Sequence, residues 1–138
     1  MRDFFNKLYN ARYETKILET KIKEKKNALY SIKGITYDKE LSKTNTNKDL
    51  ASMFAEIDEL EEELQKSKDK VSKLELYYRE EIKKITDNVK EQTILRMYYI
   101  NNFKVYQIAF MFDYSERQTM RIKRKADEKI KKYIKNVM

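Results

Sequence analysis

Three arginines recur at helical spacing near the C-terminal end of the chain, at Arg117, Arg121 and Arg124. Side chains three, four or seven residues apart lie on one face of an α-helix. A guanidinium group donates two parallel hydrogen bonds, so a row of arginines suits phosphates and guanine edges in the major groove of DNA. The alternative is a solvated helix end whose cations complement the helix dipole, which explains Lys129 but not arginines in the first two turns. The pattern therefore favours nucleic-acid binding.

The arginine row needs a helix that begins just before it. Ser115 is a favourable N-cap, and the apolar stripe that follows predicts a helix over residues 116–135. Val105–Phe112 reads as a short apolar helix, and Asp113 and Tyr114 separate it from Ser115. A helix, a three-residue turn and a basic helix in this order form the layout of a helix-turn-helix.

The turn and the helix crossing of this motif impose steric requirements. Ala109 lies where the two helices should cross, and its small side chain permits a close approach. Asp113 occupies the turn position that usually requires glycine, and we expect a positive φ there at modest cost. The positions expected to be buried at the crossing are Ile108, Phe112, Tyr114, Thr119 and Ile122.

A further helix should precede this motif and form the centre of a small bundle. Asn88 followed by Glu91 resembles a capping box, in which each side chain accepts a hydrogen bond from the other residue's backbone N–H. Apolar residues crowd positions 94–99, so we expect this helix to be buried. Asn101 and Asn102 should interrupt it, because asparagine tolerates the left-handed conformation of a tight turn.

Residues 1–87 carry two apolar seams that predict a long antiparallel helical hairpin, a coiled coil. The first helix should cover residues 3–33 and end at Gly34, and a polar loop is expected at 34–48. The second seam runs from the end of that loop to residue 85 and outlasts the first by about two turns. The part of this seam that the first helix leaves uncovered predicts a homodimer, formed mainly through the rod of residues 48–85.

Polar residues interrupt both seams. The interruptions are Thr15 and Lys25 in the first helix and Ser67 and Glu81 in the second. The apolar members are Leu8, Ala11, Leu18, Ile22, Leu29 and Ile32, then Leu50, Met53, Ile57, Leu60, Leu64, Val71, Leu74, Tyr78 and Ile85.

Composition excludes most enzyme chemistry. The 138 residues contain no Cys or His, so there is no disulfide, thiol nucleophile, Cys/His zinc site or Ser-His-Asp triad. The acidic run at residues 58–63 is interpreted as a solvated helix face, paired with Lys66 and Lys70 of the same helix, rather than as a magnesium site. We therefore expect an all-α protein that is not an enzyme and has no cofactor.

Charge and hydropathy indicate the kind of partner. The formal net charge is +8, and residues 88–138 hold 12 basic against 5 acidic residues. A basic module of this kind predicts a polyanionic partner. No stretch approaches the roughly 20 apolar residues of a membrane span, and the N-terminus shows no secretory signal, so we expect a cytoplasmic protein without a membrane partner.

Part of the sequence resembles a known family. The segments that carry the resemblance are Leu95-Arg96-Met97-Tyr98-Tyr99, Tyr106-Gln107-Ile108-Ala109 and Tyr114-Ser115-Glu116-Arg117-Gln118-Thr119. They are similar to the fourth-region helix-turn-helix of bacterial primary sigma factors. With the charged hairpin in front, the chain resembles small phage and prophage proteins of Gram-positive bacteria of the ArpU, RinA and LtrC kind, some of which are regarded as late-gene transcription regulators. The resemblance implies promoter binding, contact with host RNA polymerase and a place in the bacterial host cytoplasm.

These observations converge on double-stranded DNA as the partner of residues 88–138. The predicted DNA-binding residues are Ser115, Glu116, Arg117, Gln118, Met120, Arg121, Arg124 and Lys125. Lys123, Lys125 and Lys129 are expected to meet phosphates or solvent. Two other functions stay open: a phage small terminase subunit, which would assemble as a ring, and an interaction protein whose hairpin binds a partner.

Overall fold

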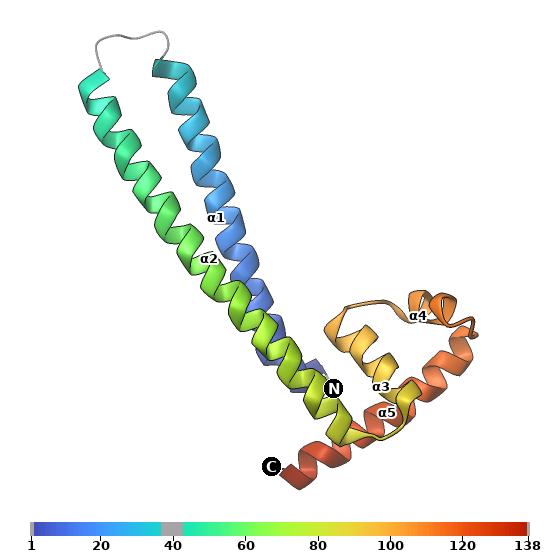
Figure 1. Cartoon of the computed structure of the whole chain (residues 1–138). Helices are drawn as coiled ribbons and strands as arrows, with labels where there is room; N and C mark the ends of the chain where they lie inside the picture. The colour runs from blue at the N-terminus through green and yellow to red at the C-terminus, as the bar shows by residue number, and fades with distance from the viewer. Residues whose placement is uncertain (1, 37–42, 138) are drawn as a thin grey trace. The chain divides into compact units, whose positions relative to one another are not determined.

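The structure is a computed structural model that describes residues 2–36 and 43–137. Its elements, in chain order, are a 3₁₀-helix η1 (Arg2–Phe5), α1 (Asn6–Thr36), α2 (Lys43–Ile85), α3 (Val89–Leu95), a π-helix η3 (Arg96–Ile100), α4 (Val105–Met111) and α5 (Glu116–Val137) (Figure 1). No strand occurs among the described residues, so the predicted all-α class is confirmed. Within the same residues, none of the helices combines the length and apolar character that a membrane crossing requires.

The chain forms two compact units. One contains Met1–Tyr9 and Ser72–Met138, and the other contains Asn10–Val71. Both long helices therefore contribute to both units: α1 enters the second unit after Tyr9, and α2 leaves it after Val71.

In the second unit, α1 and α2 lie side by side and run in opposite directions (Figure 1). Lys25 pairs with Glu56 at 2.6 Å, whereas Glu14, further back along α1, pairs with Lys70 at 3.8 Å. Among the side chains of this unit that the structure describes, the buried apolar ones are Ala11, Ile22, Leu29 and Ile57. Ion pairs this exposed contribute at most about 1 kcal/mol each, so apolar burial supplies most of the stability of the pairing.

The acidic run of α2 pairs across the two helices. Glu61 meets Lys26 of α1 at 3.1 Å, and Lys70, expected to serve an acid of its own helix, meets Glu14 instead. The expected pairing of Lys70 with an acid of its own helix was therefore wrong. The reason is that α1 presents a side chain of opposite charge beside each residue, Lys26 for Glu61 and Glu14 for Lys70.

The polar interruptions of the two seams meet each other. The hydroxyl of Thr15 donates to the Ala11 carbonyl at 2.9 Å and therefore accepts a hydrogen bond from the Ser67 hydroxyl. Both residues are half-buried. Sliding the helices by one turn would separate this pair and place both hydroxyls against apolar side chains, so the pair favours a single register.

The helix ends differ from the prediction. Helix α1 continues through Gly34 to Thr36, and α2 already begins at Lys43, so helix covers both ends of the predicted loop. A glycine inside a helix costs only about 1 kcal/mol relative to alanine and does not by itself end it. The centre of the predicted loop, residues 37–42, lies outside the described residues.

In the first unit, α5 packs against α3 and α4, and residues from the N-terminus join the same core. The ring of Phe5 stacks on Tyr99 with centroids 4.7 Å apart and an interplanar angle of 7°. Tyr78 of α2 adds a third ring, 5.0 Å from Phe5. The largest fully buried aliphatic side chains among the described residues of this unit are Leu8, Ile82, Leu95, Ile100, Ile108 and Ile130.

Glu81, the second polar residue that interrupts the α2 seam, finds a hydrogen-bond partner in this unit. Glu81 is buried and accepts a hydrogen bond from the Tyr133 hydroxyl of α5. That hydrogen bond, with burial as a second cause, raises the pKa of Tyr133 to about 12. Tyr133 therefore remains protonated at neutral pH and keeps the donor that Glu81 requires.

Candidate nucleic-acid interface

Helix α5 begins where its capping residue predicts. The Ser115 hydroxyl accepts from the Gln118 backbone N–H at 3.0 Å, and the Ser115 carbonyl accepts from the Thr119 N–H at 3.0 Å. The predicted N-cap is confirmed, and the helix continues to Val137. The cap fixes the first turn of α5, the turn that carries Arg117.

The connection between α4 and α5 is a tight turn with a left-handed residue. Asp113 has a φ of 57°, as expected from its place in the turn, and the Tyr114 N–H donates to the Ala109 carbonyl at 2.9 Å. Ala109 is buried, which agrees with its predicted place at the helix crossing. Asn102, in the turn before α4, likewise has a positive φ of 60°.

One predicted core position of this connection is wrong. Phe112 is 41% exposed, and its ring lies tilted beside Tyr114 with centroids 6.3 Å apart. It falls one residue after the end of α4, so its side chain points past the helix crossing rather than into it. Ile108 and Thr119 are fully buried as expected, and Tyr114 and Ile122 are half-buried.

The arginine row lies on the face of α5 opposite to the core. At about 100° of rotation per residue, Arg117, Arg121 and Arg124 fall within about 60° of one another and span about 10 Å along the axis. All three are exposed, and none makes an ion pair with a described residue. The buried face of the helix holds Thr119, Ala126 and Ile130.

The predicted binding residues gather on the first turns of α5. Exposed among them are Ser115, Glu116, Arg117, Gln118, Arg121, Arg124 and Lys125. Met120 is half-buried at the edge of the set. Ser115 has its hydroxyl engaged in the cap, so its role is to start the helix. The set therefore presents three guanidinium groups, an ammonium group and an amide to solvent, beside the carboxylate of Glu116.

Lys123 was expected to meet phosphates or solvent, and the structure contradicts this. Its side chain is only 12% exposed, and the ammonium group donates to Asp127 at 2.8 Å. It also lies 4.4 Å from the centroid of the Tyr98 ring. Asp127 in turn accepts from the Tyr99 hydroxyl at 2.7 Å, and burial together with this hydrogen bond raises the pKa of Tyr99. Lys123 therefore ties α5 to η3.

Lys129 is likewise engaged inside the unit. Its ammonium group donates to Glu91 at 2.6 Å and to the Thr86 hydroxyl at 3.1 Å. The Glu91 side chain is 4% exposed, and the Thr86 hydroxyl donates to the same carboxylate at 2.6 Å. Burial alone would raise the pKa of Glu91, but the hydrogen bonds from Lys129 and Thr86 outweigh it, so the pKa lies below its usual value.

The capping box predicted at the start of α3 is half right. The Asn88 side chain accepts from the backbone N–H of Lys90 at 2.9 Å and of Glu91 at 3.2 Å. Glu91 does not return a bond to Asn88, whose N–H donates to the Thr86 hydroxyl at 3.1 Å instead. Glu91 points into the unit toward Lys129, which lies 38 residues away, and no local sequence signal marks that pair.

The cations of α5 that have no acidic partner among the described residues can donate hydrogen bonds to an anion. With Lys123, Lys129 and Lys131 each paired to an acid, the unpaired cations of the first turns are the arginine row and Lys125. Guanidinium groups without protein partners can each donate hydrogen bonds to a phosphate or a base edge, and no ion pair with a described residue has to be broken first. No group of three or more acidic residues among those described is placed to hold a metal ion.

Comparison with known proteins identifies a family. A search of curated proteins and a search of solved structures both give no match. A family model described as "Protein of unknown function (DUF1492)" matches residues 36–131. The matched segment includes α3, α4, the turn at Asp113 and the whole arginine row. The chain therefore belongs to the DUF1492 family.

Proposed function

We propose that the protein is a sequence-specific DNA-binding transcriptional regulator that places the first turns of α5 in the major groove. The observation that carries this proposal is the row of three exposed arginines, unpaired and opposite to the buried face of a capped helix. The opposite face is fully used by the core, so the row is free to enter a groove without loss of packing.

The position of each residue along α5 would decide whether it contacts base edges or phosphates. Arg117 and Arg121 lie in the first two turns of α5, where recognition helices make contacts to base edges. Gln118, beside them, suits adenine through its amide group. Arg124 and Lys125, further along the helix, would meet phosphates, which fix orientation without reading sequence.

The cellular role rests on the resemblance to sigma-factor region four and to the small phage regulators. On that basis the protein acts in the cytoplasm of a bacterial host as an activator of late phage or prophage genes, without cofactor or catalysis. It would bind its promoter as a homodimer formed through residues 48–85 and contact host RNA polymerase.

Selection from a random duplex library, followed by fluorescence anisotropy on the selected and a scrambled duplex, tests the proposal. The change Arg121→Ala should reduce the free energy of binding to the selected duplex by about 1–3 kcal/mol, which raises the dissociation constant roughly 5- to 160-fold. It should have little effect on the dissociation constant for the scrambled duplex. The matched control is Lys125→Ala, which should weaken both duplexes alike and reduce the salt dependence.

Two results would contradict the proposal. If no sequence is enriched, or if Arg121→Ala and Lys125→Ala weaken both duplexes equally, the row is a non-specific electrostatic patch. The mass in solution then distinguishes the alternatives, because a ring would favour the packaging subunit of a terminase over a regulator.

A further inference from the structure

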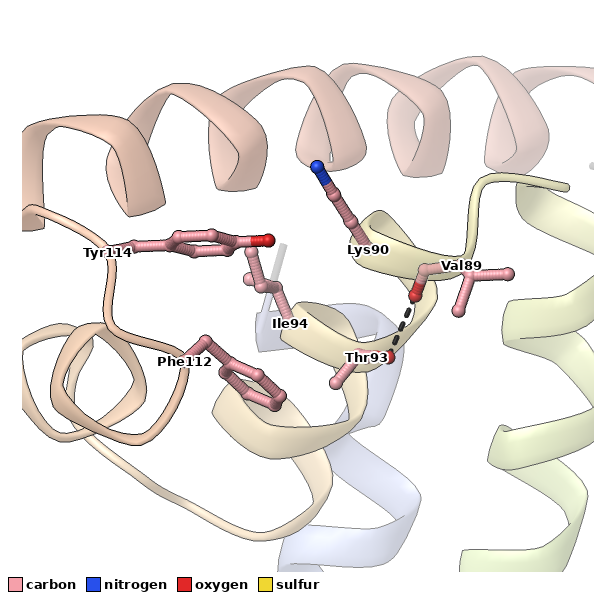
Figure 2. A pocket seen from close by; sticks show the side chains of 6 residues that line it. All are labelled: Val89, Lys90, Thr93, Ile94, Phe112 and Tyr114. Carbon is pink, nitrogen blue, oxygen red and sulfur yellow. Dashed lines mark hydrogen bonds between the residues drawn. The ribbon is translucent and has the colours of Figure 1, made fainter.

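An apolar pocket opens beside the connection between α4 and α5. Val89, Thr93 and Ile94 of α3 form one wall, and Phe112 and Tyr114 of the turn form the other. Figure 2 shows Ile94 between the two rings and the Thr93 side chain directed toward Phe112. Val89 is 71% exposed and Phe112 41%, so both rims are open to water.

The size of the pocket matches a single ring. Its volume is about 160 Å³. An apolar cavity of roughly 150 Å³ lined by Leu, Ile and Phe stays dry and binds benzene. The Thr93 hydroxyl is satisfied, because it donates to the Val89 carbonyl at 2.8 Å, which leaves the Tyr114 hydroxyl and the Lys90 ammonium group as the remaining polar side-chain groups of the lining (Figure 2). The walls are therefore mostly apolar, which favours an apolar side chain as the group that fills the pocket.

The rim carries positive charge. Lys90 belongs to the lining, and its ammonium group lies 5.7 Å from the centroid of the Tyr114 ring. Lys90 forms no ion pair with a described residue, and Glu91 next to it is neutralised by Lys129. Lys125 is close enough to lower the pKa of Glu91 further. A ligand that fills the pocket therefore meets an unpaired cation at the rim and an excess of positive charge around it.

From this combination we infer that the pocket is a docking site for an acidic partner segment that inserts one aromatic or leucine-sized side chain. Its carboxylates would pair with Lys90 at the rim, in the manner of an amphipathic helix laid into a groove. The site uses none of the arginines of α5, so the inference goes beyond DNA binding and does not depend on it.

Fluorescence anisotropy with the full chain and no DNA provides the test. The probe is a fluorescein-labelled peptide of Glu and Ala around one central Phe. The two comparison peptides replace the Phe by Ala, or every Glu by Lys. Burying the ring should make the Phe peptide bind about 10- to 100-fold more tightly than the Ala peptide. The Lys peptide should bind at least about fivefold more weakly than the Phe peptide, because like charges meet at the rim.

Protein variants then locate the site. Lys90→Glu should weaken the Phe peptide about 5- to 30-fold, because an attraction becomes a repulsion. The matched control, Lys132→Glu, makes the same change of charge at an exposed lysine of α5 that does not line the pocket. Thr93→Leu should abolish binding by filling the pocket. Phe112→Ser removes an exposed side chain of the wall and should also abolish binding. It replaces Thr93→Leu as the test if circular dichroism shows that Thr93→Leu disturbs the fold.

The inference is wrong if the Phe and Ala peptides bind equally, since the pocket then accepts no ring. It is also wrong if the Lys peptide binds as well as the Glu peptide, or if Lys90→Glu behaves like Lys132→Glu. Loss of DNA binding in Arg121→Ala with peptide binding intact would support two separate sites.

Discussion

Replacing Lys129 by methionine should be the most damaging exchange of a partly exposed side chain in the first unit. Methionine is an unbranched side chain one heavy atom shorter than lysine and has a similar helix propensity, so the change removes the ammonium group and little else. It leaves the Glu91 carboxylate, 4% exposed, with the Thr86 hydroxyl as its remaining donor. A buried carboxylate with one neutral partner must either stay charged in an apolar site or take up a proton.

The expected cost follows from the burial of the two partners. Removing one member of a fully buried ion pair costs about 3–5 kcal/mol, and an exposed pair is worth 0–1 kcal/mol. Here the acid is buried, whereas the Lys129 side chain is 44% exposed. We therefore expect a loss of about 2–3 kcal/mol in the free energy of unfolding.

Urea denaturation followed by circular dichroism measures this loss. The matched control is Lys131→Met, two residues along the same helix, whose partner Glu128 is 66% exposed. That exchange should cost less than about 0.5 kcal/mol. Adding Glu91→Gln to Lys129→Met should recover part of the stability, because a neutral amide needs no counter-charge.

Equal losses in Lys129→Met and Lys131→Met would refute this reasoning. They would mean that Glu91 is hydrated in solution and that its interaction with Lys129 is an ordinary surface ion pair. A loss of DNA binding without loss of stability would instead assign Lys129 to a phosphate contact, which is one of the two roles expected of it from the sequence.

Three further predictions concern pH, the turn and the helix register. The pKa of Glu91 is lower in the folded protein than in the unfolded chain, where it is about 4.3. The charged carboxylate therefore adds to the free energy of unfolding above that pH, and this stabilisation is lost as the pH falls through the folded pKa. The urea midpoints of the wild type and of Glu91→Gln should converge in acid. Asp113→Gly should raise the thermal midpoint, with a gain of about 0.5–1 kcal/mol, because glycine adopts the positive φ without strain; an unchanged or lower midpoint would contradict this. Thr15→Val should cost about 1–2 kcal/mol in urea denaturation by leaving Ser67 half-buried without its partner, and Thr15→Val with Ser67→Ala should cost less; the reverse order would exclude a role for this pair.

Local chemistry in the sequence was a reliable guide to the ends of the short helices. The Ser115 cap, the left-handed conformations at Asn102 and Asp113 and the small residue at Ala109 are all present in the structure. Each depends on the steric or hydrogen-bonding properties of one residue and its nearest neighbours, so a single sequence is enough to predict them. The exposed face of α5 follows from the same reasoning, because a strong apolar stripe fixes which side of a helix faces the core.

Interactions across many residues were not predictable. Glu91 fits a local capping pattern, but the structure uses it for Lys129, 38 residues away. Lys123 and Lys129 look like solvated cations in sequence, and only the packing of α5 against α3 and η3 shows that both are paired. The two compact units divide the chain after Tyr9 and after Val71, inside the long helices, whereas the change in net charge falls at residue 87.

The stacking of the N-terminal aromatics on Tyr99 has a consequence for how the protein is made. Tyr9 donates to the Tyr99 carbonyl at 2.9 Å across 90 residues of chain. At a translation rate of about 5–20 residues per second, the N-terminal segment leaves the ribosome roughly 5–20 s before Tyr99 does. During that interval Phe5 has no core to enter, and a chaperone or the same segment of a neighbouring nascent chain can compete for it. The bundle that carries the arginine row closes only after α5 has emerged, so its folding must wait for a segment synthesised about 90 residues or more after its N-terminal aromatics.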